Sequence, residues 1–104
     1  MSRPDSNTGE IVKERVQIDK KEPELYKVFL INDDYSTMEF VIHVLEKVFQ
    51  KSPAEAYRIM MHVHVDGRGV CGVYPFDVAE TRVAATDDLA QSAGYPLKAV
   101  MERE

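Results

Sequence analysis

Several features are scarce in this chain of 104 residues, and each scarcity narrows what the protein can be. Cysteine occurs once, at Cys71, so no disulfide can form within the chain and a reducing compartment is expected. No apolar run is long enough for a signal peptide or for a membrane span. We therefore expect a soluble, cytoplasmic protein.

Positive charge is also in short supply, because 13 Lys and Arg face 18 Asp and Glu, giving a formal net charge of −5. Nucleic acids and anionic membranes need clustered cations, so neither is expected as a partner. A cationic ligand, or a protein with a complementary patch, is expected instead. The chain has no G-x-S-x-G motif, no phosphate-cradling glycine loop and no Cys–His nucleophile pair, so neither an enzyme nor a cofactor is expected.

The first part of the chain differs in composition from the rest. Residues 1–24 are polar and charged and are interrupted by Pro4, Gly9 and Pro23. Such a segment has too little apolar surface to offset the entropy lost on ordering. We expect a flexible N-terminal extension over 1–24 and one core domain over 25–104.

Strand and helix signals alternate through this core. Tyr26 to Ile31 is typical of a strand. A capping box, Ser36 with Glu39, opens a helix whose apolar stripe runs to Phe49, and a second box at residues 52–55 opens another helix that stops before Asp66.

The second half of the core predicts a strand over 69–74, a helix and a last strand over 97–101. The helix carries a narrow stripe of small residues and ends at Gly94 and Pro96. The stripe comprises Ala79, Val83, Thr86, Ala90 and Ala93. The order β-α-α-β-α-β predicts a single α+β domain, with three helices packed on a three-stranded antiparallel sheet.

The first strand ends in an acceptor-rich tripeptide, Asn32-Asp33-Asp34. Asn and Asp favour turns, so a solvated turn would explain these residues. A site for a positively charged group is the alternative.

Two helix faces could enclose an apolar slot beside this tripeptide. Met60, Val63 and His64 share one face of the second helix, and Met38, Val41 and Leu45 share one face of the first helix. Methionine suits a pocket that accepts side chains of different shape. The alternative is that both stripes are ordinary core.

The segment His62-Val63-His64 raises the possibility of a metal site, and with it a small metal-dependent hydrolase. On a strand, both histidines would point the same way and could hold a metal with Asp33 or Asp34. On a helix, residues two apart lie about 200° apart around the axis and could not share an ion. The capping box before this segment favours the helix. A generic interaction domain without a pocket is the third alternative.

Taken together, these stretches resemble the ClpS family of adaptors of the ATP-dependent Clp protease. The resemblance rests on YKVFLINDDYSTMEFVIHVLEKVF, MMHVHVDGRGVCGVY, VAETRV and GYPL. It implies recognition of N-degrons, that is, proteins whose first residue is Leu, Phe, Tyr or Trp, and their delivery to the Clp unfoldase ClpA. It implies no chemistry by the protein itself, and a monomer when free.

The resemblance also assigns roles to residues of this chain. Asn32, Asp34 and His64 would hold the free α-amino group of the substrate, and Asp33 would add negative field. The slot for the first side chain would be lined by Met38, Val41, Leu45, Met60 and Val63, with Ile31 and Ser36 nearby. A second surface, Asp77, Glu80 and Arg82, would face the N-terminal domain of the unfoldase.

Overall fold

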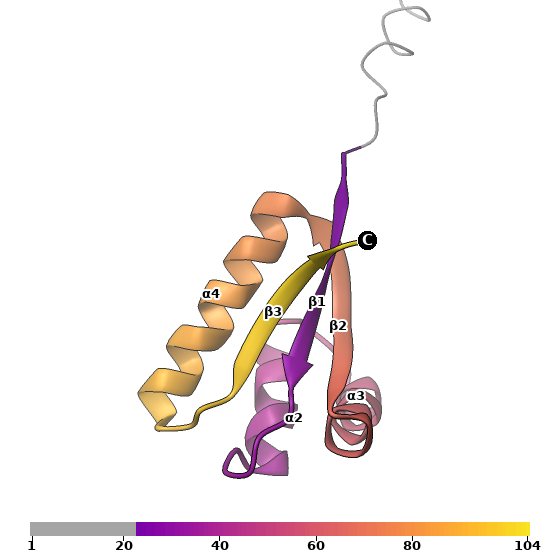
Figure 1. The fold of residues 1–104 in the computed structure, drawn as a ribbon. Coiled ribbons are helices and arrows are strands. Elements are labelled where there is room, and N and C mark those ends of the chain that lie inside the picture. Colours follow the sequence, from indigo (N-terminus) through magenta and orange to yellow (C-terminus); the bar gives the residue numbers. More distant parts are fainter. Residues whose placement is uncertain (1–22) are drawn as a thin grey trace, which may run out of the picture.

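The sheet has three antiparallel strands in the order β2-β1-β3, as the computed structural model of residues 23–104 shows (Figure 1). Their bounds are β1 Leu25–Ile31, β2 Arg68–Pro75 and β3 Lys98–Arg103. Because β1 is paired on both sides, it is the most buried strand, and Val28 and Leu30 have no exposed surface. All three strands fall where the sequence predicts them.

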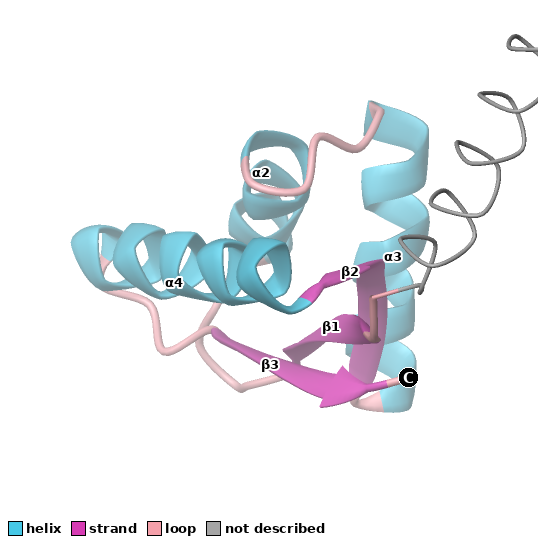
Figure 2. Ribbon diagram, turned by 90° about the horizontal axis from the view of Figure 1, so that it is seen from above, coloured by secondary structure: helices cyan, strands magenta, loops and turns pink. Residues whose placement is uncertain are grey.

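Three helices complete the domain: α2 Met38–Lys47, α3 Pro53–Asp66 and α4 Phe76–Ala93. Viewed from above, α2 and α4 lie over one face of the sheet, and α3 stands beside β2 (Figure 2). The close approach of α3 to β2 depends on Gly69, since a Cβ there would lie 2.9 Å from Cγ2 of Val63. The predicted α+β architecture and its element order are confirmed.

The two capping predictions have different outcomes. Ser52 caps α3, because its Oγ accepts a hydrogen bond from the N–H of Glu55 at 3.2 Å. The prediction that Ser36 caps the first helix is wrong. Thr37 is the N-cap residue of α2, and its Oγ1 accepts from the N–H of Phe40 at 3.0 Å.

The core is continuous from the sheet through α2 and α3 to α4. Small side chains bring α4 close to the sheet, with Ala79, Thr86 and Ala90 buried as predicted, whereas Ala93 is exposed. The buried hydroxyl of Thr86 is satisfied, because it donates to the backbone oxygen of Arg82 at 2.9 Å. Burial raises the pKa of the Cys71 thiol to about 12, so this residue behaves as a small apolar side chain.

Two further expectations concern the N-terminal extension and the lack of a membrane-spanning segment. The predicted flexible extension over 1–24 lies outside the described residues, apart from Pro23 and Glu24. None of the helices within residues 23–104 has the length and apolar character needed to cross a membrane.

Candidate functional site

A cavity of about 270 Å³ opens between the loop after β1, the start of α2 and the last turns of α3. Its lining combines polar side chains from the loop with apolar side chains from the two helices. The lining residues are Asn32, Asp33, Asp34, Ser36, Met38, Val41, Met60, Val63 and His64. The structure thus gathers every predicted substrate-binding residue except Leu45.

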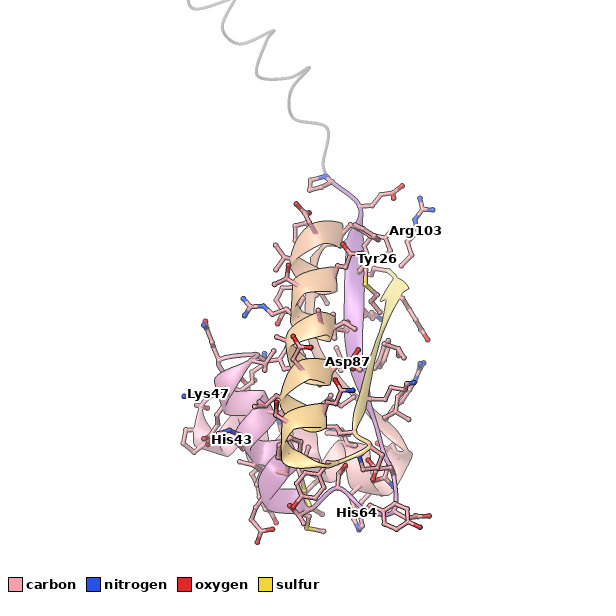
Figure 3. The ribbon with its side chains drawn as sticks, turned by 90° about the vertical axis from the view of Figure 1, so that its left-hand side faces the viewer. Tyr26, His43, Lys47, His64, Asp87 and Arg103 are labelled. Carbon is pink, nitrogen blue, oxygen red and sulfur yellow. The ribbon has the colours of Figure 1, made fainter. Side chains whose placement is uncertain are left out.

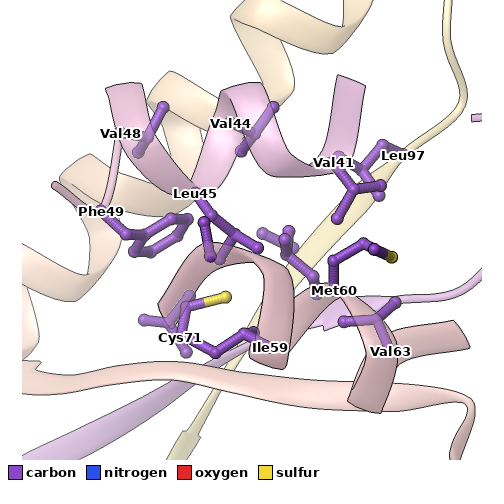
Figure 4. Close-up of a cluster of buried hydrophobic side chains, with 14 of the residues drawn as sticks. Val41, Val44, Leu45, Val48, Phe49, Ile59, Met60, Val63, Cys71 and Leu97 are labelled. Atoms are coloured by element: carbon purple, nitrogen blue, oxygen red, sulfur yellow. The ribbon is translucent and has the colours of Figure 1, made fainter. Parts of the chain in front are cut away.

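The apolar wall is deep at one end and open at the other. Val41 keeps 6%, Met60 2% and Val63 3% of its surface exposed, whereas Met38 keeps 44% and stands at the mouth. In the close-up, Val41 on α2 faces Met60 and Val63 on α3 at one end of the buried cluster (Figure 4). The slot is therefore an extension of the core that remains open to solvent.

Leu45 does not belong to this wall. It is fully buried within the core cluster and does not line the cavity. Figure 4 shows it one helical turn from Val41, deeper among the core side chains. The apolar stripe of α2 thus lines the cavity at Val41 and packs into the core at Leu45.

Asp33 holds the loop that supplies the polar side chains. Its Oδ1 accepts from the N–H of Tyr35 at 2.8 Å and from the N–H of Ser36 at 2.7 Å. Partial burial pushes the pKa of this carboxyl up, but the hydrogen bonds from Ser36 and Tyr35 outweigh that effect, and the pKa lies below its usual value. Because Asp33 binds the backbone of Ser36, the helix starts one residue later, at the Thr37 cap.

The loop is also tied to the end of α3 through the backbone. The N–H of Asn32 donates to the carbonyl oxygen of Gly67 at 2.9 Å, and the N–H of Gly67 donates to Val63 at 3.0 Å. Gly67 ends α3 in the left-handed region, at φ 91°, which favours glycine.

The polar side of the cavity offers several acceptors. Asn32, Asp34 and His64 are exposed, and Figure 3 places His64 at the end of the molecule opposite Arg103. Within residues 23–104, Oδ2 of Asp33 and Oγ of Ser36 are buried without a hydrogen-bond partner. Buried polar atoms are normally satisfied, so Oδ2 of Asp33 can accept from a further donor.

The predicted partner surface on α4 contains two kinds of residue. Asp77 and Glu80 are exposed, as expected for a solvated face. Arg82 is half-buried instead, because its Nη1 donates to the carbonyl oxygen of Val48 at 2.6 Å and its guanidinium lies 5.5 Å from the Tyr74 ring. Arg82 therefore also contributes to the packing of α4.

The alternative of a metal site needs a group of His, Cys, Asp or Glu that could hold an ion. The part of the chain that the structure describes contains no such group of three or more. The segment from His62 to His64 is helical, and His62 Nδ1 lies 3.1 Å from Asp66 Oδ2 on the outer side of α3. The two histidines therefore serve different surfaces.

Comparisons with known proteins agree with one another. The family model for "ATP-dependent Clp protease adaptor protein ClpS" matches residues 21–100. The chain is 56% identical to the ClpS of Maricaulis maris over 84 residues (81% of this chain, 77% of that protein). It is 50% identical to the ClpS of Hyphomonas neptunium over 100 residues (96% and 85%). The solved structure of Agrobacterium tumefaciens ClpS2 bound to L-phenylalaninamide is 44% identical, with a TM-score of 0.77, covering 80% of this chain and 100% of that one.

The fold is that of a small domain with a cavity of mixed polarity, and the class that the family model and the relatives' names give is a non-enzymatic adaptor. The chain belongs to the ClpS family, the adaptors of the ATP-dependent Clp protease.

Proposed function

We propose that this adaptor binds the free N-terminus of proteins whose first residue is Leu, Phe, Tyr or Trp, and delivers them to the Clp unfoldase ClpA. The observation that carries the proposal is the cavity, in which a buried apolar wall meets a rim of acceptors. The ligand of the related Agrobacterium tumefaciens protein, L-phenylalaninamide, has the same two parts, a free α-amino group and an apolar side chain.

The polar rim suits an ammonium group. An α-amino group has a pKa near 7.7–8.0, so it is mostly cationic at neutral pH and carries three donors. Asn32 offers an amide oxygen, Asp34 a carboxylate oxygen, and His64 an unprotonated ring nitrogen. The remaining free oxygen of Asp33 adds negative charge beside them.

The apolar wall suits the first side chain. Burying an aromatic side chain removes about 150–250 Å² from water, worth roughly 4–6 kcal/mol at about 25 cal/mol per Å². Charge-assisted hydrogen bonds add about 1.5–3 kcal/mol each, and ordering the peptide end subtracts several kcal/mol. The balance gives a micromolar-scale affinity, which allows an adaptor to release its cargo.

Delivery needs a second surface that stays free while the cavity is filled. The exposed carboxylates of Asp77 and Glu80, with Arg82 beside them, lie on α4, whereas the cavity is built from the β1–α2 loop, α2 and α3. We assign this α4 surface to the N-terminal domain of ClpA. Substrate and unfoldase would then be bound by different elements at the same time.

A peptide titration tests the binding step. A free Phe-initiated peptide should bind, and its Nα-acetylated form should not, because acetylation removes the charge and most of the donors. Asp34→Asn should weaken binding by removing one charged acceptor, whereas Asp87→Asn, an exposed aspartate on α4, should not. Equal affinity for the free and acetylated peptides would exclude the proposed site.

A further inference from the structure

The outer face of α3 carries a second depression that the proposed site does not use. It is an open groove of about 450 Å³ lined by Tyr57, Arg58, Met61, His62, Val65 and Asp66. Tyr57 is 56% and Val65 70% exposed, and with the half-buried Met61 they recur every four residues along the helix. Such a row of exposed apolar side chains marks a surface that contacts something else.

This groove begins where the rim of the cavity ends. Residues three apart are neighbours on a helix, so Met61 lies beside His64, and Tyr57 lies beside Met60. His64 and Met60 both line the cavity. The exposed His64 at the rim of the cavity and the half-buried Met61 in the groove lie between the two depressions, so a chain that leaves the cavity past His64 reaches the groove next.

We infer that the groove is a second subsite for the same substrate polypeptide and takes an apolar side chain at its third or fourth residue. The inference rests on the proposed function, because the occupant is the chain whose first residue fills the cavity. It extends recognition beyond the first residue.

Helix geometry sets the position of that side chain. Met61 lies about 4.5 Å along the axis from His64 and about 60° around it, and Val65 lies about 100° around it. On a cylinder of about 5–6 Å radius, the path from the amino-group site to the groove is about 7–10 Å. An extended chain covers this distance in about two to three residues.

The edges of the groove favour an uncharged, apolar segment. Arg58 is paired with Glu55 at 3.2 Å, and His62 is paired with Asp66 at 3.1 Å. These polar groups are thus engaged on their own helix, which leaves the apolar row of Tyr57, Met61 and Val65 as the part of the groove that an apolar side chain would contact.

A second copy of this chain is a poorer occupant. The helix spans only about 21 Å and offers three apolar side chains, whereas a stable interface buries about 800 Å² per partner. An entering substrate chain needs no such area, because its first residue is already bound.

The test uses a labelled reference peptide in which Phe is followed only by Ser, called the all-Ser form. It is compared with a series of peptides in which one Ser, at each position from 2 to 6 in turn, is replaced by Leu. Leu at position 3 or 4 should bind about three- to tenfold more tightly than the all-Ser form, in line with partial burial of one side chain. In the Val65→Ser variant this advantage should disappear, so that the peptide with Leu at position 3 or 4 and the all-Ser form bind with equal affinity. Val78→Ser, a change at an exposed apolar residue of α4, should keep the advantage.

The outcomes separate this inference from the proposed function. If the all-Ser peptide binds the parent but no position of Leu improves it, or if the advantage persists in Val65→Ser, the subsite is excluded and the cavity stands. If the all-Ser peptide does not bind at all, the proposed function fails and the subsite with it. Self-association of the free protein that Val65→Ser abolishes would assign the groove to a second copy and overturn the inference.

Discussion

Arg82 provides the sharpest test of the packing between α4 and the end of α2. Its Nη1 donates to Val48 at 2.6 Å, and its guanidinium stacks 5.5 Å from the Tyr74 ring. A charged hydrogen bond contributes about 1.5–3 kcal/mol and a cation–π contact about 0.5–1 kcal/mol. Against these, the Nε of Arg82 is buried without a partner in the described part of the chain, which costs stability. We expect Arg82→Ala to lower the free energy of unfolding by about 2 kcal/mol.

Chemical denaturation of the protein measures the change in the free energy of unfolding, and thermal denaturation measures the matching change in Tm. For a domain of this size, a loss of about 2 kcal/mol corresponds to a fall in Tm of about 8–16 °C. Glu80→Ala, on the same helix but exposed, should change stability by less than about 0.5 kcal/mol. Arg82→Lys should fall between, because lysine can donate to Val48 but cannot stack as a plane.

A loss below about 0.5 kcal/mol in Arg82→Ala would refute this account and leave Arg82 as a surface residue. The expected loss also has a practical consequence. Reversing the charge of Arg82 would disturb the fold together with any docking to the unfoldase. Asp77→Lys and Glu80→Lys are the cleaner probes of that docking, since both residues are exposed.

Three further predictions concern the cavity and its loop. His64→Ala should bind a Phe-initiated peptide more weakly at neutral pH, because it removes one of the acceptors that line the cavity. An unchanged affinity in the titration would exclude His64 from the amino-group site. Met38→Ala should allow peptides that begin with Ile or Val to bind, because it removes the side chain at the mouth of the cavity. If the ranking of Leu, Phe, Ile and Val peptides by affinity is unchanged, another residue excludes Ile and Val. Thr37→Ala should lower the free energy of unfolding by about 1 kcal/mol, because it removes the cap of α2. Ser36→Ala should lower it by less, because Ser36 is not the cap residue, and equal losses would contradict the assigned cap.

The sequence predicted the fold because local signals and apolar periodicity agreed over most of the core. The helix that starts after Ser52 has its capping serine, a proline at the first position and a glycine after its last residue, and the structure uses all three. The start of α2 was misplaced because two hydroxyl residues stand side by side. The choice between Ser36 and Thr37 depends on Asp33, whose carboxylate engages the N–H of Ser36.

The candidate site was partly predictable for the same reason. Spacing placed Met60, Val63 and His64 on one helix face, and the cavity is lined by all three. Spacing could not distinguish Leu45, which belongs to the core, from Val41, which lines the cavity. It also could not reveal that Arg82 reaches the carbonyl of Val48, because that contact joins residues 34 positions apart in the chain.

The acceptors of the cavity come from the loop after β1 and from the end of α3. The hydrogen bond from the N–H of Asn32 to the carbonyl oxygen of Gly67 joins these two segments through their main chains. Asn32 and Asp34 lie on one side of this bond and His64 on the other, so a contact between main-chain atoms contributes to their relative placement. Substitutions in the apolar wall leave this main-chain contact in place, so they can change which first residue fits while the acceptors for a free N-terminus are kept. Within one scaffold, the requirement for a free chain end would stay fixed while the preference among apolar residues drifts over evolutionary time.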